Sequence, residues 1–450
     1  MLPPVPVSGL SDAERFPALA PERLELLRRL REHSFAPRYT FACGDRLTTE
    51  GLEAVRRYER ALFAPRHSWR HGESPDWLVR LAAYCLEQVP FYRHRGGRAA
   101  DVLALPPIGR DDLARAPWAF VPDDVPAEDL LTYSTSGTTG PPMPVLSSPV
   151  AASCYLPALR FALDRHGVTL EGGADRVAIA LVCAQRSTLT YASVVTPLDG
   201  AGFVKINLAE SEWRHADDPA RFLDDLAPEV LTGDPFSFMR LAELPLRHRP
   251  KALVSTAMTL VPGVRTRLES RFGCPVIDVY SMTECRMIAV ATDSGHEIVP
   301  HDLYVEILAA DGTPLPPGQR GEIVVSGGFN PCLPLLRYRT GDFASLDLGD
   351  DRVVLKDLQG RSPVRLEDSG GRMVNTIDVA QALASFPLAG YHCHQGLDRS
   401  LVLAAYGADV DPGEVMAALR PLFGGLLITV EVRDTVVVDR KVRPFSSEIP

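Results

Sequence analysis

A run of small hydroxyl residues and glycines is the stretch of the chain that points most directly to chemistry. Residues 133–142 read YSTSGTTGPP and contain no lysine or arginine. Backbone N–H groups in a glycine-rich turn can point at phosphate oxygens, and serine and threonine hydroxyls add donors that fix a phosphate in place. The stretch therefore indicates a phosphate cradle other than the Walker loop, which needs a lysine after its last glycine. A flexible loop is the competing interpretation of the same composition.

Two further motifs offer carboxylates. YSMTE (280–284) directly follows PVIDVY, a predicted buried strand, and open α/β sheets bind ligands at the carboxyl ends of their strands. Glu284 is a candidate Mg²⁺ ligand, because that ion is held by one or two carboxylates plus substrate phosphates. YRTGD (338–342) supplies Asp342, which we expect in a turn where its carboxylate accepts hydrogen bonds from the hydroxyls of a ribose.

The elements that must position these residues follow a clear order. Residues 11–100 have apolar residues at helical spacings, with Ser74 before Pro75 as the expected cap of one helix. From about 130 to 335, short apolar runs alternate with amphipathic stretches, which predicts an α/β domain with a largely parallel sheet. The predicted strands include VAIALV (177–182), KALVSTAM (251–258) and PVIDVY (275–280), and PGVRTRLESRFG (262–273) is a predicted helix.

The remainder predicts a β-rich portion and a separate small domain. YVEIL (304–308), GEIVVSG (321–327) and DRVVLKDL (351–358) are expected strands separated by turn signals. Beyond about Gly360 the pattern restarts with alternating helical and strand-like segments, which predicts a compact α+β cap. We therefore expect a large domain over 1–360, with a helical lead-in over about 1–125, and a small domain over 361–450.

Composition narrows the functional class. The 450 residues are 46% hydrophobic, and 47 basic against 57 acidic side chains give a net charge of −10, which argues against a nucleic-acid partner. The start of the chain lacks a basic segment followed by an apolar run, and no stretch is long and apolar enough to span a membrane. We expect a cytoplasmic protein without a membrane partner.

The cysteines do not suggest a disulfide framework or a zinc ribbon. Eight of them are scattered without a CxxC pair, so we expect mostly buried thiols. In the triplet His392-Cys393-His394, strand alternation would turn Cys393 away from both histidines, which argues against a metal site there.

Taken together in this order, the motifs resemble the adenylate-forming superfamily of acyl-CoA synthetases, and within it the phenylacetate-CoA ligase-like branch. The resemblance covers nearly the whole chain. Besides the three motifs above, it includes VPFYRHR (89–95), LTGDPFSFMRLAEL (231–244), VSTAMTL (254–260), the Gly360-Arg361 pair and DRKVRPF (439–445).

The resemblance implies ATP and Mg²⁺ as cofactors and a role for each matching residue. Tyr280 and Thr283 would line the adenine and α-phosphate side, Asp342 and Arg361 would contact the ribose, and Glu284 would hold Mg²⁺. Lys441 would bridge the substrate carboxylate and the α-phosphate, although a solvated tail lysine is the alternative for a residue so near the end. The residues implied to cradle the phosphates are Ser136, Gly137, Thr138, Thr139 and Gly140, and Thr139 is expected to act with Lys441 and Glu284 in catalysis.

The implied reaction joins a carboxylic acid, aromatic by family analogy, to AMP with release of pyrophosphate. The protein positions the reactants and offsets charge, and needs no nucleophile of its own. The expected acyl pocket lies around Val182–Tyr191, Asp234–Phe238 and Thr256–Thr259, with Arg186 or Arg240 as a partner for a second polar group or as a surface arginine. The candidate substrate-binding residues are Tyr191, Asp234, Phe236, Thr256, Ala257 and Ser281.

The sequence also departs from the family. Pro141 and Pro142 stand where a lysine usually follows the hydroxyl loop, VSTAMTL lacks the usual glutamate, and Ser281 replaces a glycine. Pro363 lies near the hinge that lets the small domain rotate, and proline restricts such motion. We therefore hypothesise that the acyl group passes to an amine or a carrier-protein thiol, with free coenzyme A uncertain as the acceptor.

Two other functions remain open on the sequence. A small oxyanion such as nitrite would be adenylated for attack by an amine, and it would need no acyl tunnel. A degenerate nucleotide-binding scaffold would account for the lost lysine and glutamate, against the retained Glu284, Asp342 and Lys441. The family analogy also allows a homodimer.

The resemblance further implies a possible zinc site, because the branch often carries a Cys/His cluster after the T-E motif. The matching region here has His296 and His301, with Cys285 upstream and Cys332 downstream. Ligands separated in sequence can converge, but surface or core-satisfied histidines are the favoured interpretation.

Overall fold

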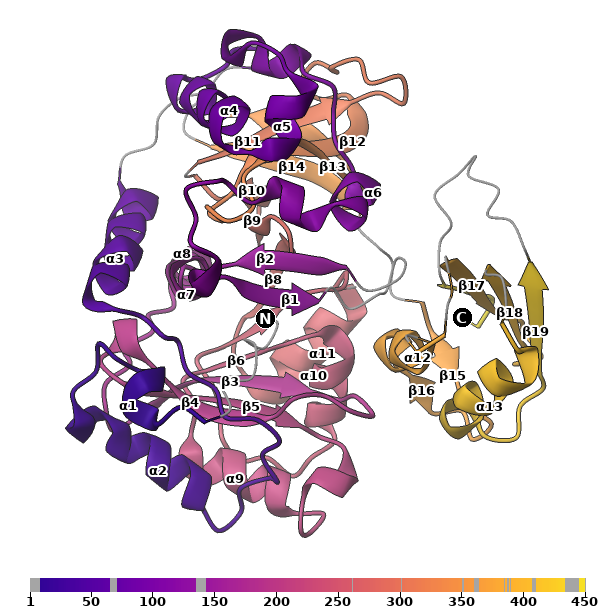
Figure 1. The fold of residues 1–450 in the computed structure, drawn as a ribbon. Coiled ribbons are helices and arrows are strands. Elements are labelled where there is room, and N and C mark those ends of the chain that lie inside the picture. The colour runs from indigo at the N-terminus through magenta and orange to yellow at the C-terminus, as the bar shows by residue number, and fades with distance from the viewer. Residues whose placement is uncertain are drawn as a thin grey trace. The chain divides into compact units, whose positions relative to one another are not determined.

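The computed structural model divides the chain into two compact units. The first consists of Met1–Tyr133, Val145–Cys183 and Leu189–Arg361, and the second of Ser134–Pro144, Ala184–Thr188 and Ser362–Pro450 (Figure 1). The residues that the structure describes are 9–64, 71–134, 143–260, 262–300, 302–349, 352–359, 364–383, 385–386, 388, 390–406, 410–433 and 445–449. The domain boundary expected at residue 360 falls outside these ranges and stays a prediction.

The N-terminal lead-in is built from short helices. Ser11 begins α1 with a capping box, in which its hydroxyl accepts from the Glu14 N–H and Glu14 bonds back to Ser11. The expected cap at Ser74 is wrong, because the helix has Pro75 at its N-cap, and proline is suited to helix starts. The helices are α1 (Asp12–Arg15), α2 (Glu25–Glu32), α3 (Thr49–Phe63), α4 (Asp76–Gln88), α5 (Pro90–Arg95) and α6 (Arg110–Arg115).

In the described part of the chain, twelve strands form one continuous sheet with the order β11-β12-β13-β14-β10-β9-β8-β7-β6-β3-β5-β4. The strands from β5 to β8 in this order pair in parallel, whereas β4 and all strands beyond β8 pair antiparallel. The predicted α/β class is thus confirmed. The strands are β3 (Val177–Cys183), β4 (Tyr191–Val195), β5 (Ala201–Asn207), β6 (Val230–Gly233), β7 (Ala252–Ser255), β8 (Val276–Met282), β9 (Arg286–Thr292), β10 (Gly295–Ile298), β11 (Leu303–Leu308), β12 (Arg320–Gly327), β13 (Leu335–Leu348) and β14 (Val353–Gln359).

Helices cover both faces of the parallel strands. Apolar residues of α3 and α8 share one core cluster with one face of these strands, while α10 contacts β3 and α11 contacts β8. Gly233 marks a close approach on the α10 side, since an added Cβ would lie 2.9 Å from the Val182 carbonyl oxygen and 3.2 Å from the Phe238 ring. The remaining helices of this unit are α7 (Pro149–Ser153), α8 (Tyr155–Asp164), α9 (Asp218–Leu226), α10 (Pro235–Ala242) and α11 (Pro262–Phe272).

The lead-in is joined to the antiparallel strands by direct hydrogen bonds. In Figure 1, α4 and α5 lie against the β11–β14 region, and α4 contacts β12. Ile108 forms a parallel bridge with Tyr338 of β13, because its N–H donates to the Arg337 carbonyl and its carbonyl accepts from the Arg339 N–H. The lead-in thereby fixes the strand that carries the YRTGD motif.

The expected turn at Asp342 is wrong, because this residue lies within β13. The pairing of β12 with β13 shifts register between Glu322 and Val324, and Gly341 has a φ of 76°. The Gly341 N–H donates to Glu322 Oε1, 3.0 Å away, instead of to a ladder carbonyl. A glycine in this left-handed conformation is typical of a bulge that redirects the strand beside a site.

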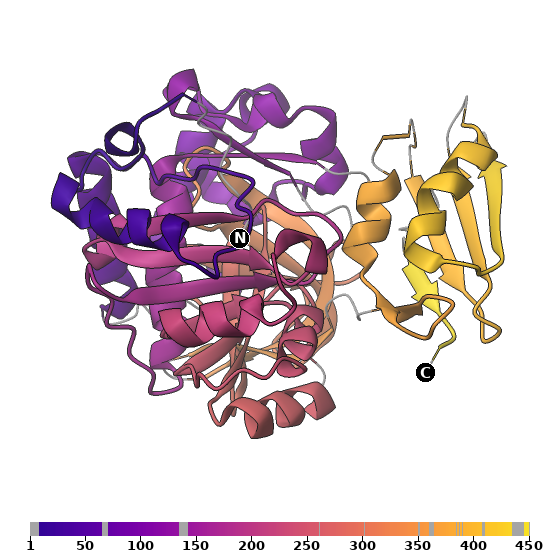
Figure 2. The same ribbon diagram turned by 90° about the horizontal axis from the view of Figure 1, so that it is seen from below.

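The second unit has a four-stranded sheet, ordered β19-β18-β17-β20 among its described residues. Helices α12 and α13 lie on one face of it (Figure 2), where they share an apolar core with Cys393 and Leu403. This α+β arrangement matches the expected fold class. Its elements are β15 (Leu366–Glu367), β16 (Met373–Val374), α12 (Thr376–Leu383), β17 (Gly390–Gln395), β18 (Leu401–Tyr406), α13 (Pro412–Phe423), β19 (Ile428–Arg433) and β20 (Phe445–Ser447).

The burial of the cysteines and the composition of the helices can both be compared with the sequence predictions. All eight cysteines are free thiols, and all except Cys274 are buried, as expected. No helix within the described ranges combines the length and apolarity that crossing a bilayer requires.

A buried ion pair holds β13 to β11, and its loss should destabilise the first unit. Arg337 donates to both carboxylate oxygens of Glu306, at 2.9 and 3.0 Å, and to the Leu105 carbonyl at 2.6 Å. We expect Arg337→Met to lower the free energy of unfolding by roughly 3–5 kcal/mol, because Glu306 would remain buried without its partner. Denaturant titration followed by fluorescence measures this change.

The neighbouring Arg339 provides a matched control. Its pair with Glu322 spans 3.4 Å and both side chains are more exposed, so Arg339→Met should cost about 1 kcal/mol or less. Equal losses for the two variants would contradict the assignment of Arg337.

Asp45 gives this unit a pH-dependent stability. Burial raises the pKa of Asp45 to about 6 from an ordinary value of 3.8, although its carboxylate accepts from the Leu47 and Thr196 N–H groups. Because the folded state holds this proton more tightly, the wild type loses stability as pH rises from about 4 to about 6. Asp45→Asn keeps an acceptor and removes this loss, so its melting temperature should rise relative to the wild type over that range.

Asp311 serves as the control of opposite sign. The Thr313 N–H lowers the pKa of this exposed carboxyl, so Asp311→Asn should lose a little stability relative to the wild type as pH rises through the acidic range. The same pH response in both variants would contradict the assignment of Asp45.

Candidate functional site

The candidate site lies where β8 changes its pairing. Val276–Asp278 pair in parallel with β7, whereas Val279–Met282 pair antiparallel with β9. The YSMTE motif therefore starts where the strand leaves the parallel array, at the array's carboxyl edge. A strand edge freed in this way is the usual place for a ligand in an open α/β sheet.

Tyr280 and Asp342, far apart in the sequence, meet at this edge. The Tyr280 hydroxyl donates to Asp342 Oδ2 at 2.9 Å, and Asp342 is 6% exposed. The Asp342 N–H donates to Thr340 Oγ1 at 3.1 Å, which fixes the backbone beside the bulge. Burial, together with the Asp342 carboxylate, holds the pKa of Tyr280 well above its ordinary value, so its hydroxyl remains a donor at neutral pH.

Glu284 and Tyr338 make a second bond between the same two motifs. Thr283–Cys285 form the turn between β8 and β9, and Glu284 at its centre is 5% exposed. Its Oε1 accepts from the Tyr338 hydroxyl at 3.2 Å, and burial is the main cause of the raised pKa of Tyr338. Two phenol–carboxylate hydrogen bonds thus connect β8 and its turn to β13, with both carboxylates at the junction.

Asp234 and Phe236 lie at the start of α10, directly after β6. Asp234 caps this helix, because its carboxylate accepts from the Ser237 N–H at 2.9 Å and from the Ser237 hydroxyl at 2.7 Å. Burial raises the pKa of Asp234, while Phe236 is half-buried. The structure gives Asp234 a capping role, and its contact with substrate stays a prediction.

Thr256 and Ala257 lie in the segment that follows β7. The Thr256 N–H donates to the Gly233 carbonyl at 2.9 Å, which joins the ends of β6 and β7. Ala257 has a φ of 71°, a left-handed conformation that costs roughly 1–2 kcal/mol for an alanine. Strained backbone at the carboxyl edge of a sheet is typical of a binding segment.

The structure distributes the other candidates differently. Ser281 and Thr283 lie beside Tyr280 and Glu284 on β8 and its turn, and both are half-buried. The ring of Tyr191 lies in the core of the first unit, 1% exposed and stacked on Phe203 with 5.9 Å between ring centroids. Arg240 is exposed and paired with Glu243, as a surface arginine would be. The contacts described here do not join Tyr191 or Arg240 to the β8 junction.

Several predicted residues lie outside the described part of the chain. Strands β1 (Leu131–Ser134) and β2 (Pro144–Ser147) lie on either side of the hydroxyl stretch in the sequence. Nothing structural is assigned to the stretch itself or to the expected hinge and terminal lysine. These residues are Ser136, Gly137, Thr138, Thr139, Gly140, Pro141, Pro142, Gly360, Arg361, Pro363 and Lys441.

The histidines considered for metal binding have other partners. His296 Nε2 lies 3.4 Å from Asp278 Oδ2. Cys393 lies in the small core, whereas His392 and His394 bond to the Ser446 hydroxyl at 3.0 and 2.8 Å, so the expected alternation is confirmed. Over the described residues, which exclude His301, no group of three or more His, Cys, Asp or Glu side chains converges as a metal site would require.

Sequence reasoning missed two residues of the junction. Tyr338 belongs to the quoted motif, but only the pairing of β13 brings its hydroxyl to Glu284. Arg286 follows the turn and donates to the Ser147 hydroxyl on β2. A cation two residues after a candidate metal ligand was the signal available in the sequence.

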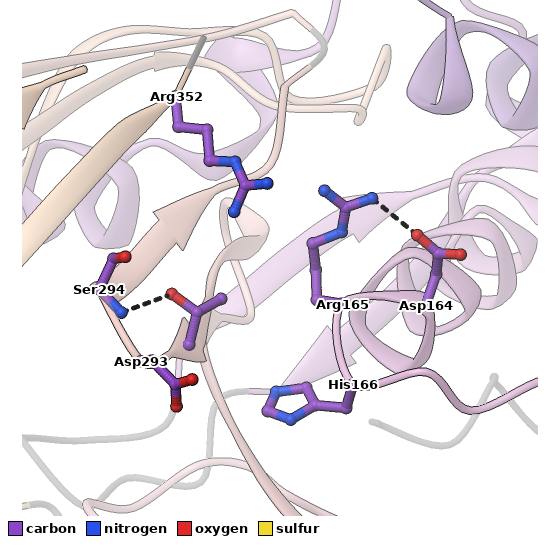
Figure 3. A pocket seen from close by; sticks show the side chains of 7 residues that line it. Asp164, Arg165, His166, Asp293, Ser294 and Arg352 are labelled. Carbon is purple, nitrogen blue, oxygen red and sulfur yellow. Dashed lines mark hydrogen bonds and ion pairs between the residues drawn. The ribbon is translucent and has the colours of Figure 1, made fainter. Parts of the chain in front are cut away.

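A separate cavity of about 440 Å³ opens elsewhere in the first unit. Arg165 and Arg352 extend into it from two sides (Figure 3), with Asp164, His166 and Asp293 among its lining residues. Its cations are already matched, because Arg165 pairs with Asp164 at 2.7 Å and both arginines lie within 4 Å of the buried carboxylate of Glu297. At the β8 junction, by contrast, the carboxylates of Asp342 and Glu284 bond to neutral tyrosine hydroxyls. The charges of this cavity therefore give less reason to expect a charged ligand.

Comparisons with known proteins agree with the motifs. The family model described as AMP-binding enzyme matches residues 99–330. The phenylacetate-coenzyme A ligase of Thermus thermophilus is 26% identical over 60% of this chain and 64% of its own length. Protein CapK of Staphylococcus aureus is 21% identical over 71% of this chain and 73% of its own length.

A solved structure agrees with the fold. A 2-hydroxyisobutyryl-CoA ligase, in complex with 2-HIB-AMP and CoA in the thioesterification state, superposes with a TM-score of 0.56 at 19% identity. The match covers 91% of this chain and 93% of that one. The chain therefore belongs to the AMP-binding enzyme family of adenylate-forming enzymes, in its phenylacetate-CoA ligase-like branch.

Proposed function

We propose that this protein is an ATP-dependent ligase that activates a carboxylic acid as its acyl adenylate and then passes the acyl group to a thiol. The observation that carries the proposal is the junction of β8 and β13, where Asp342 and Glu284 are each held by a tyrosine hydroxyl. Membership in the AMP-binding enzyme family indicates a nucleotide substrate. The junction has one carboxylate that could bind the sugar of this nucleotide and one that could bind its metal ion.

Asp342 is suited to bind the ribose. A carboxylate can accept several hydrogen bonds at once, so the bond from Tyr280 orients Asp342 and is compatible with further bonds from sugar hydroxyls. Because burial keeps the Tyr280 hydroxyl protonated, this orientation should hold across neutral pH. A contact between Arg361 and the same ribose, implied by the family resemblance, stays a prediction.

Glu284 fits a magnesium ion that is shared with the phosphates. A single carboxylate is enough, since Mg²⁺ keeps several waters and takes substrate phosphates as ligands. When bound, the ion would offset negative charge on the phosphates. The Tyr338 hydroxyl, 3.2 Å from Oε1, fixes the direction in which the carboxylate points.

The reaction then needs position and charge balance more than protein nucleophiles. An oxygen of the substrate carboxylate forms a bond to the α-phosphorus, the bond from that phosphorus to the bridging oxygen breaks, and its electron pair leaves with pyrophosphate. A thiolate next attacks the acyl carbonyl, and AMP leaves with the electron pair of the anhydride bond. Lys441 and Thr139 remain the proposed groups that steady the first step.

The names of the relatives guide the choice of acid and acceptor. Ligation to coenzyme A supports a thiol acceptor, and phenylacetate supports an aromatic acid. The hypothesis of an amine or carrier-protein acceptor rests on Pro363, which is outside the described residues. Coenzyme A is therefore the first acceptor to test, and a homodimer remains an untested expectation.

Pyrophosphate exchange tests the first half-reaction. Incubation with labelled pyrophosphate, MgATP and a panel of aromatic acids, aliphatic acids and nitrite should give labelled ATP with an aromatic acid. Addition of coenzyme A should then give a thioester. Exchange only with nitrite would favour the oxyanion alternative, ATP binding without exchange would favour the scaffold, and exchange without thioester would favour the other acceptors.

Glu284→Gln should reduce the exchange rate by about 100-fold or more, because the neutral amide is a poor magnesium ligand and charge on the phosphates is no longer offset. Exchange rates at graded Mg²⁺ concentrations measure the change. Glu229→Gln is the control, since Glu229 is similarly buried, at 8% exposed, but pairs with Lys251 at the start of β6. Its exchange rate should stay near that of the wild type, and equal losses would contradict the magnesium role.

Tyr280→Phe should weaken AMP binding by about threefold to tenfold, because Asp342 loses one orienting hydrogen bond of ordinary strength. Calorimetric titration of AMP gives the affinity. Tyr304→Phe is the control, because this buried tyrosine lies on β11, away from the junction. Unchanged AMP affinity in a folded Tyr280→Phe protein would remove Asp342 from the ribose site.

A further inference from the structure

Arg286 is a half-buried cation whose Nε is enclosed and which has no carboxylate partner in the described ranges. It begins β9, its Nη2 donates to the Ser147 hydroxyl, and its guanidinium carbon lies 5.4 Å from the centroid of the Tyr133 ring. Its Nε is buried without a hydrogen-bond partner, and no acidic side chain in the described ranges pairs with it. A charge withdrawn from water in this way is costly unless an anion offsets it.

A second unsatisfied group lies against the same strand. Asn330 is 3% exposed, and its Nδ2 donates at 2.9 Å to the carbonyl of Leu146, the residue before Ser147. Its Oδ1 is buried and has no hydrogen-bond partner. Buried polar atoms are nearly always satisfied. The two unsatisfied atoms belong to Arg286 and Asn330, which bond to consecutive residues of β2, so a ligand or ordered water is expected to complete their hydrogen bonds.

The position of Arg286 identifies the ligand as a polyanion. Glu284, the proposed magnesium ligand, lies two residues earlier, on the turn that precedes β9. Tyr133 and Ser147 belong to the strands that precede and follow the hydroxyl stretch in the sequence. Residues 135–142 contain no charged side chain. A guanidinium presents its donors in a rigid fork that matches phosphate oxygens.

We propose that Arg286 binds the β- and γ-phosphates of the nucleotide, which leave as pyrophosphate. This inference rests on the proposed function. As the bond between the α-phosphorus and the bridging oxygen breaks, the electron pair passes to pyrophosphate, and the guanidinium offsets the added charge without losing a proton. Arg286 thus acts on the leaving group, on the side of the α-phosphorus away from the attacking acid.

Arg165 is a matched control within the same unit. Its Nε is also buried without a hydrogen-bond partner, and its guanidinium carbon lies 5.1 Å from the Phe161 ring centroid, much as Arg286 lies against Tyr133. It differs in having a carboxylate partner, since Asp164 accepts from it at 2.7 Å (Figure 3). Its charge is therefore already offset, and no phosphate is needed to balance it.

Calorimetric titration with ATP and, separately, with AMP distinguishes this role from a structural one. Arg286→Gln should weaken ATP binding by roughly 10- to 100-fold, the loss typical of a charge-assisted hydrogen bond, and leave AMP binding within about twofold. Arg286→Lys keeps the charge without the fork and should lose about threefold to tenfold in ATP affinity. Arg165→Gln should bind both nucleotides as the wild type does, and thermal melting confirms that each variant is folded.

Several outcomes would overturn the inference. A folded Arg286→Gln protein with wild-type ATP affinity would do so, as would equal losses for ATP and AMP, which indicate a purely structural role. A rise in the KM of the acid alone would place Arg286 at the acyl group instead. If Arg286→Gln does not fold, wild-type ATP affinity in Arg286→Lys decides against the proposal. A wild type that binds neither nucleotide would refute the proposed function, and the inference with it.

Discussion

The candidate site depends on the change of partner along β8. Where β8 pairs with β7, its side chains pack within a parallel sheet that helices cover on both faces. From Val279 onward β8 pairs with β9 instead. The switch opens a gap in the parallel ladder at its carboxyl edge. Tyr280, Ser281 and the turn with Glu284 all follow within a few residues, so the position of the switch decides where ligand-binding groups can gather.

Two tyrosine hydroxyls then hold the junction together. Each hydrogen bond contributes only about 1 kcal/mol to stability, but each also fixes the direction of a buried carboxylate. Tyr280 orients Asp342 and Tyr338 orients Glu284. The lead-in contributes indirectly, because the bridge between Ile108 and Tyr338 sets the path of β13. A segment far from the site in sequence therefore helps to position a residue within it.

Charge is distributed unevenly over this junction. Asp342 and Glu284 are acidic, the hydroxyl stretch is neutral, and Arg286 is a cation with no carboxylate partner among the described residues. Elsewhere in the same unit Arg337 and Arg165 each have a carboxylate partner. This difference between Arg286 and the paired arginines has an energetic consequence. An unpaired charge in low-dielectric surroundings costs free energy, and a polyphosphate substrate would offset that charge.

The sequence alone indicated the fold class, several of the strands and helices, and the motifs, because hydrophobic periodicity and turn residues are local properties. It placed β8 and the YSMTE motif correctly, and it missed the bulge at Gly341 that puts Asp342 within a strand. Only the tertiary structure decided which residues meet. Tyr338 reaches Glu284, and Arg286 reaches Ser147, through pairings between segments that are 54 and 139 residues apart. Such contacts depend on sheet register and packing, which no short stretch of sequence specifies.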